Sequence, residues 1–241
     1  MPRALAIVHQ LDTGPSVFRD EALALGWDMD SWLIPAGSET PADPHSYDAV
    51  FAFGGAMHAD QEAEHPWLRD EKDLLASLLD AGMPTMGVCL GSQLLAEAAG
   101  ARAERAPEPE IGWYELELTP EGARDPVLGG IDSPFEAFQW HSYRSPLPPG
   151  AVELASNPIG TQAYRIGDSA WGIQFHAEVS EEDAVSWAVN YDVDEDAIKM
   201  GVDPDELHAQ IRLRIGEWNR LGRNLCGRFL GVAESLAGEP A

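Results

Sequence analysis

The chain is poor in basic residues and has no long apolar run, and each shortage excludes a class of protein. Its 241 residues hold 15 lysines and arginines against 41 aspartates and glutamates, a formal net charge of −26. Such a chain repels phosphate, so nucleic-acid binding is excluded as its main function. A membrane helix needs about eighteen consecutive apolar residues, and no such stretch occurs, so the sequence predicts no membrane span.

Cysteine and lysine are also scarce. Cys89 and Cys226 are the only cysteines, too few for a disulfide framework, and a free thiol suits a reducing cytoplasm. The N-terminus lacks the long apolar region of a signal peptide, which also predicts a cytoplasmic location. Lysine occurs only twice. The composition reflects either the coding bias of a GC-rich genome or an acidic surface adapted to salt.

The most informative segment surrounds Cys89. An apolar run ends at Val88, Gly87 and Gly91 flank the cysteine, and a helical pattern follows. This is the Gly-x-nucleophile-x-Gly elbow with cysteine as the nucleophile. The elbow would place the thiol at a helix N-terminus, whose partial positive charge favours the thiolate. The segment therefore predicts a catalytic cysteine.

A second strand-like run, residues 170–175, leads into His176, Ala177 and Glu178. In an extended chain, residues two apart point to the same side, so Glu178 can reach the imidazole of His176. Together with Cys89 they predict a nucleophile, a base and a carboxylate that orients the base. The alternative is an ordinary strand end with a solvated histidine and glutamate.

Paired glycines follow a third strand signal, residues 47–53. Gly54 and Gly55 expose backbone N–H groups, which with the N–H of Leu90 would form an oxyanion hole. The alternative is a plain turn.

Alternating strand and helix patterns predict an α/β fold with a doubly wound, mostly parallel sheet between two helical layers. Short strand-like runs lie between residues 101 and 170, at residues 114–118, 135–138, 152–155 and 162–166, and predict antiparallel strands added at the edge of that sheet. After Val179 the pattern is helical, with one long helix over residues 204–236 that breaks near Gly222. We expect a main domain at residues 1–180 and a helical extension at residues 181–241 packed on it.

These motifs together resemble the class I, triad-type glutamine amidotransferases, and in particular the stand-alone branch labelled GMP-synthase-like amidotransferase. Besides the motifs of Cys89 and His176, residues 110–113 and the pair Trp140-His141 carry the resemblance. It covers about residues 4–179 and implies a flavodoxin-like fold. Two positions depart from the family pattern, because Ala177 stands where proline is usual and Ser142 where glycine or aspartate is frequent.

The resemblance also implies roles for individual residues. Cys89 would be the nucleophile, His176 the base and Glu178 its orienting partner. The oxyanion donors would be Gly55 and Leu90. Residues that would contact the substrate are Gly54, Gln93, His141, Ser142 and Tyr143.

The remaining histidines and the second cysteine have simpler interpretations. His141 either lines the pocket or is a packed polar residue. His58 lies either near the site or, as we expect, in a solvated loop. His9, His45, His65 and His208 lack ligand-like spacing, so no metal site is predicted. Cys226 and the apolar stripe from Ile211 to Leu225 are expected to pack in the core.

The predicted activity is hydrolysis of the side-chain amide of glutamine, or of a γ-glutamyl compound, through a cysteine thioester. No cofactor is required. Three possibilities stay open: a glutaminase subunit that supplies ammonia to a separate synthetase, a γ-glutamyl amide or peptide hydrolase acting alone, and an inactive binding or regulatory module.

Overall fold

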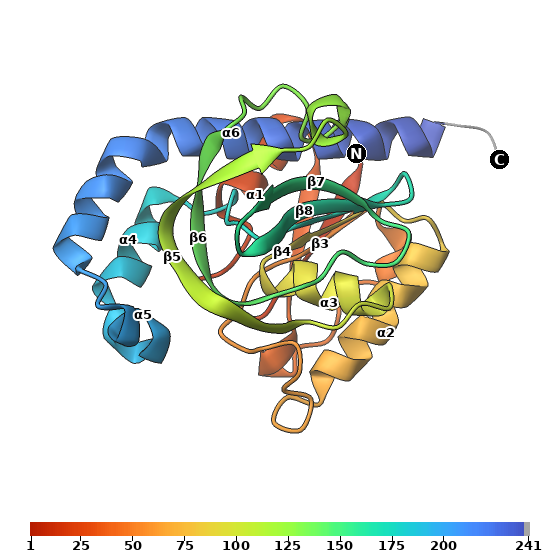
Figure 1. The fold of residues 1–241 in the computed structure, drawn as a ribbon. Helices are drawn as coiled ribbons and strands as arrows, with labels where there is room; N and C mark the ends of the chain where they lie inside the picture. Colours follow the sequence, from red (N-terminus) through yellow and green to blue (C-terminus); the bar gives the residue numbers. More distant parts are fainter. Residues whose placement is uncertain (239–241) are drawn as a thin grey trace.

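A computed structural model describes residues 1–238 and contains a nine-stranded sheet with helices on both faces (Figure 1). The strands are β1 (Arg3–Val8), β2 (Asp28–Leu33), β3 (Ala49–Ala52), β4 (Thr85–Val88), β5 (Glu104–Leu118), β6 (Phe135–Arg144), β7 (Val152–Asn157), β8 (Gly160–Ile166) and β9 (Ala170–Ile173). They lie side by side in the order β2-β1-β3-β4-β9-β8-β7-β5-β6.

Six α-helices cover this sheet within residues 1–238. They are α1 (Ser16–Ala24), α2 (Trp67–Asp80), α3 (Leu90–Ala98), α4 (Glu181–Val189), α5 (Glu195–Met200) and α6 (Pro204–Gly238). Short 3-10 turns occur at η1 (Ile34–Ala36), η2 (Pro44–Ser46), η3 (Gly122–Arg124) and η4 (Tyr191–Val193). Across these described residues, every helix is too short or too polar to cross a membrane.

Alternating side chains of the central strands build two cores. Leu5 and Ile7 of β1 face the buried leucines of α2 and α3. Ala6 and Val8 of the same strand face the opposite layer, where α1, α4 and α6 pack. Because successive residues of a strand point to opposite faces, an uninterrupted apolar strand needs helices on both sides.

The sheet changes direction at β9. Strands β2, β1, β3, β4 and β9 are parallel, whereas β8, β7, β5 and β6 join them through antiparallel pairs. The long strands β5 and β6 curve away from the sheet as one ribbon (Figure 1). The predicted fold, a doubly wound parallel sheet with an antiparallel edge extension, is therefore confirmed.

The C-terminal helices differ from expectation in two respects. Helix α6 runs unbroken through Gly222, so the predicted break is wrong. A Cβ atom at Gly222 would lie 1.9 Å from the carbonyl oxygen of Ala177, which shows that the glycine permits close packing. Helix α5 was not predicted, because its six residues carry little periodic signal. The division of the chain at residue 180 stays a prediction.

Candidate active site

The carboxyl ends of the parallel strands open into one cavity of about 580 Å³. Cys89 follows β4, His176 follows β9, and Gly55 follows β3, so all three lie where open parallel sheets usually bind ligands. The outer wall comes from β6 and from the segment between α4 and α5. Sequence motifs from separate parts of the chain thus meet at a single site.

The backbone at Cys89 has the geometry of a nucleophile elbow. Its φ of 51° and ψ of −112° are unusual for a residue with a side chain, and such conformations cost about 1–3 kcal/mol. The flanking glycines are required by crowding, because a Cβ at Gly87 would lie 2.5 Å from the oxygen of Gly91, and one at Gly91 2.0 Å from that of Ala52. Surrounding packing therefore holds the cysteine in a strained turn, as at many functional sites.

The thiol of Cys89 lies at the N-terminus of α3 and faces β6. Its Sγ atom is 3.8 Å from the carbonyl oxygen of Trp140. The Ser92 hydroxyl, one turn into α3, donates to the Cys89 carbonyl oxygen at 2.7 Å. The cysteine backbone is thereby fixed, with its sulfur at the N-terminal end of the helix.

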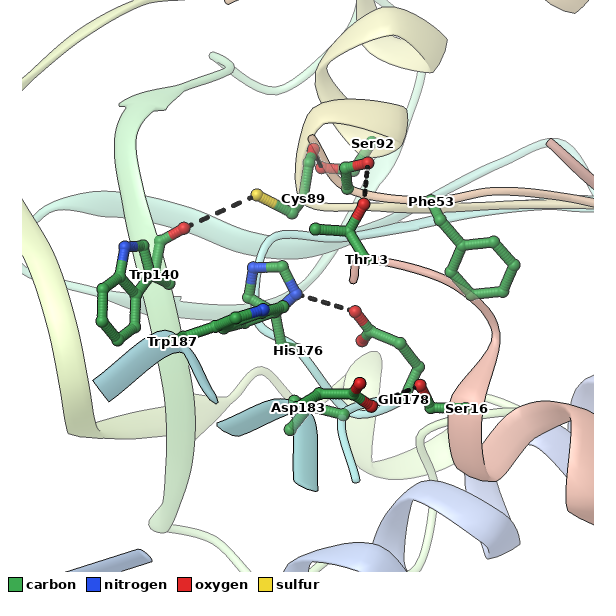
Figure 2. Close-up of polar contacts among 12 residues, drawn as sticks. Thr13, Ser16, Phe53, Cys89, Ser92, Trp140, His176, Glu178, Asp183 and Trp187 are labelled. Carbon is green, nitrogen blue, oxygen red and sulfur yellow. Dashed lines mark hydrogen bonds and ion pairs between the residues drawn. The ribbon is translucent and has the colours of Figure 1, made fainter. Parts of the chain in front are cut away.

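His176 and Glu178 form a buried pair beside this thiol. Nδ1 of His176 lies 2.7 Å from Oε1 of Glu178, and the imidazole lies between Cys89 and Glu178 (Figure 2). Burial lowers the pKa of His176, but the charges of Glu178 and Cys89 and hydrogen bonds to both hold it well above 6.5. The pair can therefore carry a positive charge next to the Cys89 sulfur.

Helix α6 supports the segment that carries this pair. The indole Nε1 of Trp218 donates to the His176 carbonyl oxygen at 2.8 Å. The amide of Asn219 donates to the carbonyl oxygen of Val179 at 2.6 Å. With the close approach of Gly222 to Ala177, these contacts fix the backbone that places the imidazole and the carboxylate.

The Gly54-Gly55 loop lies opposite the elbow. Among residues 1–238, the N–H groups of Gly55 and Leu90 have no acceptor, and both residues line the cavity. They are therefore free to donate to a ligand. Gly54 is not part of the cavity wall, and its carbonyl oxygen instead accepts hydrogen bonds from the segment after β1.

The other predicted contact residues also line the cavity, Ser142 among them. Gln93 is 3% exposed and donates through Nε2 to the Tyr143 carbonyl oxygen and to Gln174. His141 packs between Glu110, at 3.1 Å, and the Tyr143 carbonyl oxygen, at 2.9 Å. His141 therefore borders the cavity and is also packed, and its contact with substrate stays a prediction.

Two aromatic contacts complete this wall, and the sequence pointed only to the first of the two residues. His58 lies beside the site, one of its two interpretations, and stacks on the ring of Tyr143, with centroids 4.1 Å apart. Trp187 of α4 packs edge-on against His176 at 4.8 Å. Beyond it, Asp194 accepts from the indole of Trp140 at 2.9 Å and caps α5.

His9 is the largest omission. It follows β1 at the same edge of the sheet as the other site residues, and that position is the signal by which it could have been found. Its ring is buried against Glu71 and the Gly54 loop. Within residues 1–238, no group of three or more His, Cys, Asp or Glu side chains has the arrangement of a metal site.

The chain is similar to a family of known proteins in both sequence and fold. A family model described as "Glutamine amidotransferase class-I" matches residues 20–186, more than half of the chain. The putative glutamine amidotransferase-like protein YfeJ of Salmonella typhimurium is 31% identical over 180 residues, which are 73% of this chain and 75% of that protein. One subunit of the glutamine-hydrolyzing GMP synthase of Sulfurisphaera tokodaii is 26% identical over 58% of this chain and 74% of its own.

A solved structure is similar over nearly the whole length. A glutamine amidotransferase from Thermotoga maritima superposes with a TM-score of 0.84 at 29% sequence identity. The match covers 95% of this chain and 98% of that one. The helices after residue 180 are therefore part of the shared architecture.

Proposed function

The chain belongs to the class I glutamine amidotransferase family, and from this premise we propose that it hydrolyses the side-chain amide of glutamine or of a γ-glutamyl compound. One observation carries the proposal. A strained cysteine at a helix N-terminus shares a cavity with a buried His176–Glu178 pair whose atoms are 2.7 Å apart. A nucleophile, a base and an orienting carboxylate are the groups that acyl transfer needs.

In the proposed first step, the Cys89 thiolate attacks the carboxamide carbon. The carbonyl oxygen becomes an oxyanion, which accepts hydrogen bonds from the N–H groups of Gly55 and Leu90. The tetrahedral intermediate then collapses and the C–N bond breaks. The His176 imidazolium gives its proton to the departing nitrogen, which leaves as ammonia or an amine and a thioester remains.

Hydrolysis of the thioester completes the cycle. His176, now neutral, takes a proton from water as the water oxygen attacks the thioester carbon. The C–S bond breaks, glutamate leaves, and the Cys89 thiolate and the His176 imidazolium are restored. Glu178 holds the ring so that Nε2 faces the reaction and stabilises its charged form.

The size of the cavity favours a second candidate, hydrolysis of larger γ-glutamyl amides. At about 580 Å³ the cavity extends from Cys89 past Trp140 to Lys199 on α5, a size typical of sites for drug-sized ligands. It has room for a leaving group beyond ammonia. The similarity to one component of a GMP synthase favours the other arrangement, in which ammonia passes to a separate synthetase.

Steady-state kinetics on the purified protein tests the proposal. We expect glutamate release from glutamine or from a γ-glutamyl alkylamide, and no release by Cys89→Ser or His176→Ala. A higher kcat/KM for glutamine supports the glutaminase that supplies ammonia. A higher kcat/KM for the γ-glutamyl alkylamide supports the hydrolase of larger γ-glutamyl amides. Turnover of neither substrate would favour the inactive binding or regulatory module.

Labelling tests the nucleophile separately from turnover. A glutamine-like electrophile, followed by peptide mass spectrometry, should modify Cys89. Cys226 is the internal control, because burial raises the pKa of its thiol and it donates to the Phe18 carbonyl oxygen inside the core. Modification of Cys226 in place of Cys89 would contradict the assignment.

A further inference from the structure

A second buried histidine–glutamate pair lies directly behind the Gly54-Gly55 loop. His9 is 1% exposed and Glu71 of α2 is 2% exposed. Nε2 of His9 lies 2.8 Å from Oε2 and 2.9 Å from Oε1 of Glu71. The proposed reaction does not involve this pair, yet burying two ionisable groups is costly unless each is fully hydrogen-bonded.

Both nitrogens of the His9 ring face acceptors. Nδ1 lies 3.0 Å from the Phe53 carbonyl oxygen and 3.2 Å from that of Gly54, and carbonyl oxygens only accept. Nδ1 therefore carries a hydrogen, and Nε2 faces a carboxylate. Burial lowers the pKa of His9, but the charge and hydrogen bond of Glu71 and the two carbonyl contacts outweigh it and raise the pKa. Because both ring nitrogens face acceptors, these contacts favour the charged imidazolium form of His9.

The Gly54 carbonyl is the link to the active site. It accepts from Nδ1 of His9 and also from the Thr13 hydroxyl at 2.9 Å. The same peptide group ends in the N–H of Gly55, which lines the cavity and has no protein acceptor within residues 1–238. Hydrogen bonds to a peptide oxygen polarise the group and strengthen its N–H as a donor.

The surroundings fix the ring in this position. The indole of Trp67 stacks on His9 with centroids 5.4 Å apart and planes inclined by 12°. A Cβ on Gly55 would lie 2.9 Å from the Cβ of His9, so the loop passes directly over the histidine. The side chain of Gln10, the next residue, accepts from the N–H of Ala56 at 3.3 Å.

We propose that His9, held by Glu71, is a positioning residue that orients and polarises the Gly54–Gly55 peptide so that its N–H stabilises the oxyanion. The kinetic test of this inference rests on the proposed hydrolysis. Its structural test, the state of the Gly55 amide, does not. His9 acts through the peptide group and does not touch the substrate.

Glu71→Gln separates charge from geometry. The carboxamide nitrogen donates to Nε2 of a neutral His9, while Nδ1 keeps its hydrogen and its contact with Gly54. We expect kcat for glutamine or γ-glutamyl amide hydrolysis to fall roughly tenfold, the lower end of the range for lost supporting contacts. KM should stay within about twofold, because the oxyanion forms only in the transition state.

The double variant His9→Leu/Glu71→Met removes both partners together. Replacing a buried ion pair by apolar residues is often neutral for stability, so this variant separates the catalytic effect from a loss of the fold. Loss of an oxyanion donor lowers kcat about 10²–10³-fold, and we expect a loss near that range. Asp125→Asn is the matched control, because the buried Asp125 pairs with the half-buried Arg165 away from the cavity. It should destabilise the protein without changing kcat.

Two further measurements distinguish the oxyanion role from other causes. Alkylation of Cys89 by iodoacetamide builds no oxyanion, so its rate should stay the same in Glu71→Gln. In ¹⁵N-glycine-labelled protein, the Gly55 amide proton should shift upfield in both variants, because its peptide is less polarised. Equal slowing of alkylation and hydrolysis, or an unmoved Gly55 signal, would overturn the inference. If the wild-type protein hydrolyses neither substrate, the proposed function fails. The Gly55 amide signal then still decides whether His9 and Glu71 polarise the Gly54–Gly55 peptide.

Discussion

Gly222→Ala is the sharpest test of how α6 supports the active site. Alanine is about 1 kcal/mol better than glycine inside a helix, and at Gly216 and Gly231, where the added Cβ meets open space, that gain should appear in full. At Gly222 the same Cβ would lie 1.9 Å from the Ala177 carbonyl oxygen. Overpacking costs about 1–3 kcal/mol, so Gly222→Ala should be less stable than either control by about that amount.

Thermal melting of the three variants measures this difference. For a chain of this size 1 kcal/mol corresponds to about 2–4 °C, so Gly222→Ala should melt about 2–12 °C below Gly216→Ala and Gly231→Ala. Its kcat should also fall, because Ala177 lies between His176 and Glu178 and the clash displaces both. The controls should keep wild-type kcat. If Gly222→Ala melted with the controls, the close contact between α6 and the catalytic segment would be wrong.

Three other outcomes follow from the charges of the molecule. Glu178→Gln should lower kcat/KM by roughly 10²–10⁴-fold in the hydrolysis assay, because the ring loses its orienting partner, and an unchanged value would contradict the pairing. The pKa of His176 is raised above 6.5 in the folded state. Protonated His176 therefore stabilises the fold fully below about pH 6.5, and this stabilisation is lost as the pH rises through the folded-state pKa. Melting temperature should therefore fall above about pH 6.5, and fall less in His176→Gln. The net charge of −26 means that the folded protein repels itself. Molar NaCl should raise its melting temperature, since the screening length shrinks to about 3 Å at 1 M. A melting temperature that stays flat or falls with NaCl would contradict charge repulsion as the dominant surface effect.

The parallel half of the fold could be predicted because its signals are local. Each central strand is a short apolar run that ends in glycine, cysteine or histidine, and the helices between them have regular apolar spacing. The antiparallel ribbon was predicted only in part. Strand β5 begins at Glu104, well before the expected run at Tyr114, and its first half alternates charged residues with proline. Its pairing with β6 through a bulge is a tertiary effect that such a pattern does not reveal.

The site could be predicted where a motif carries the chemistry. The elbow at Cys89 and the His-x-Glu segment each have a fixed local spacing, and the structure brings them into one cavity. His9 and Glu71 are 62 residues apart, and no spacing rule joins them. Gly222 was misjudged because glycine lowers helix stability and was taken as a break, whereas here it is tolerated for a packing reason, since it lets α6 approach Ala177.

The supporting contacts share one chemical pattern, in which a side chain donates to a backbone carbonyl of a segment that carries a proposed catalytic group. Ser92 donates to the Cys89 carbonyl, Trp218 to that of His176, and Thr13 and His9 to that of Gly54. A carbonyl contact fixes the peptide orientation and leaves the catalytic side chain or N–H free to face the cavity. The residues that set the active-site geometry therefore lie largely outside the recognisable motifs, and substitutions there should alter kcat while Cys89, His176 and Glu178 remain intact.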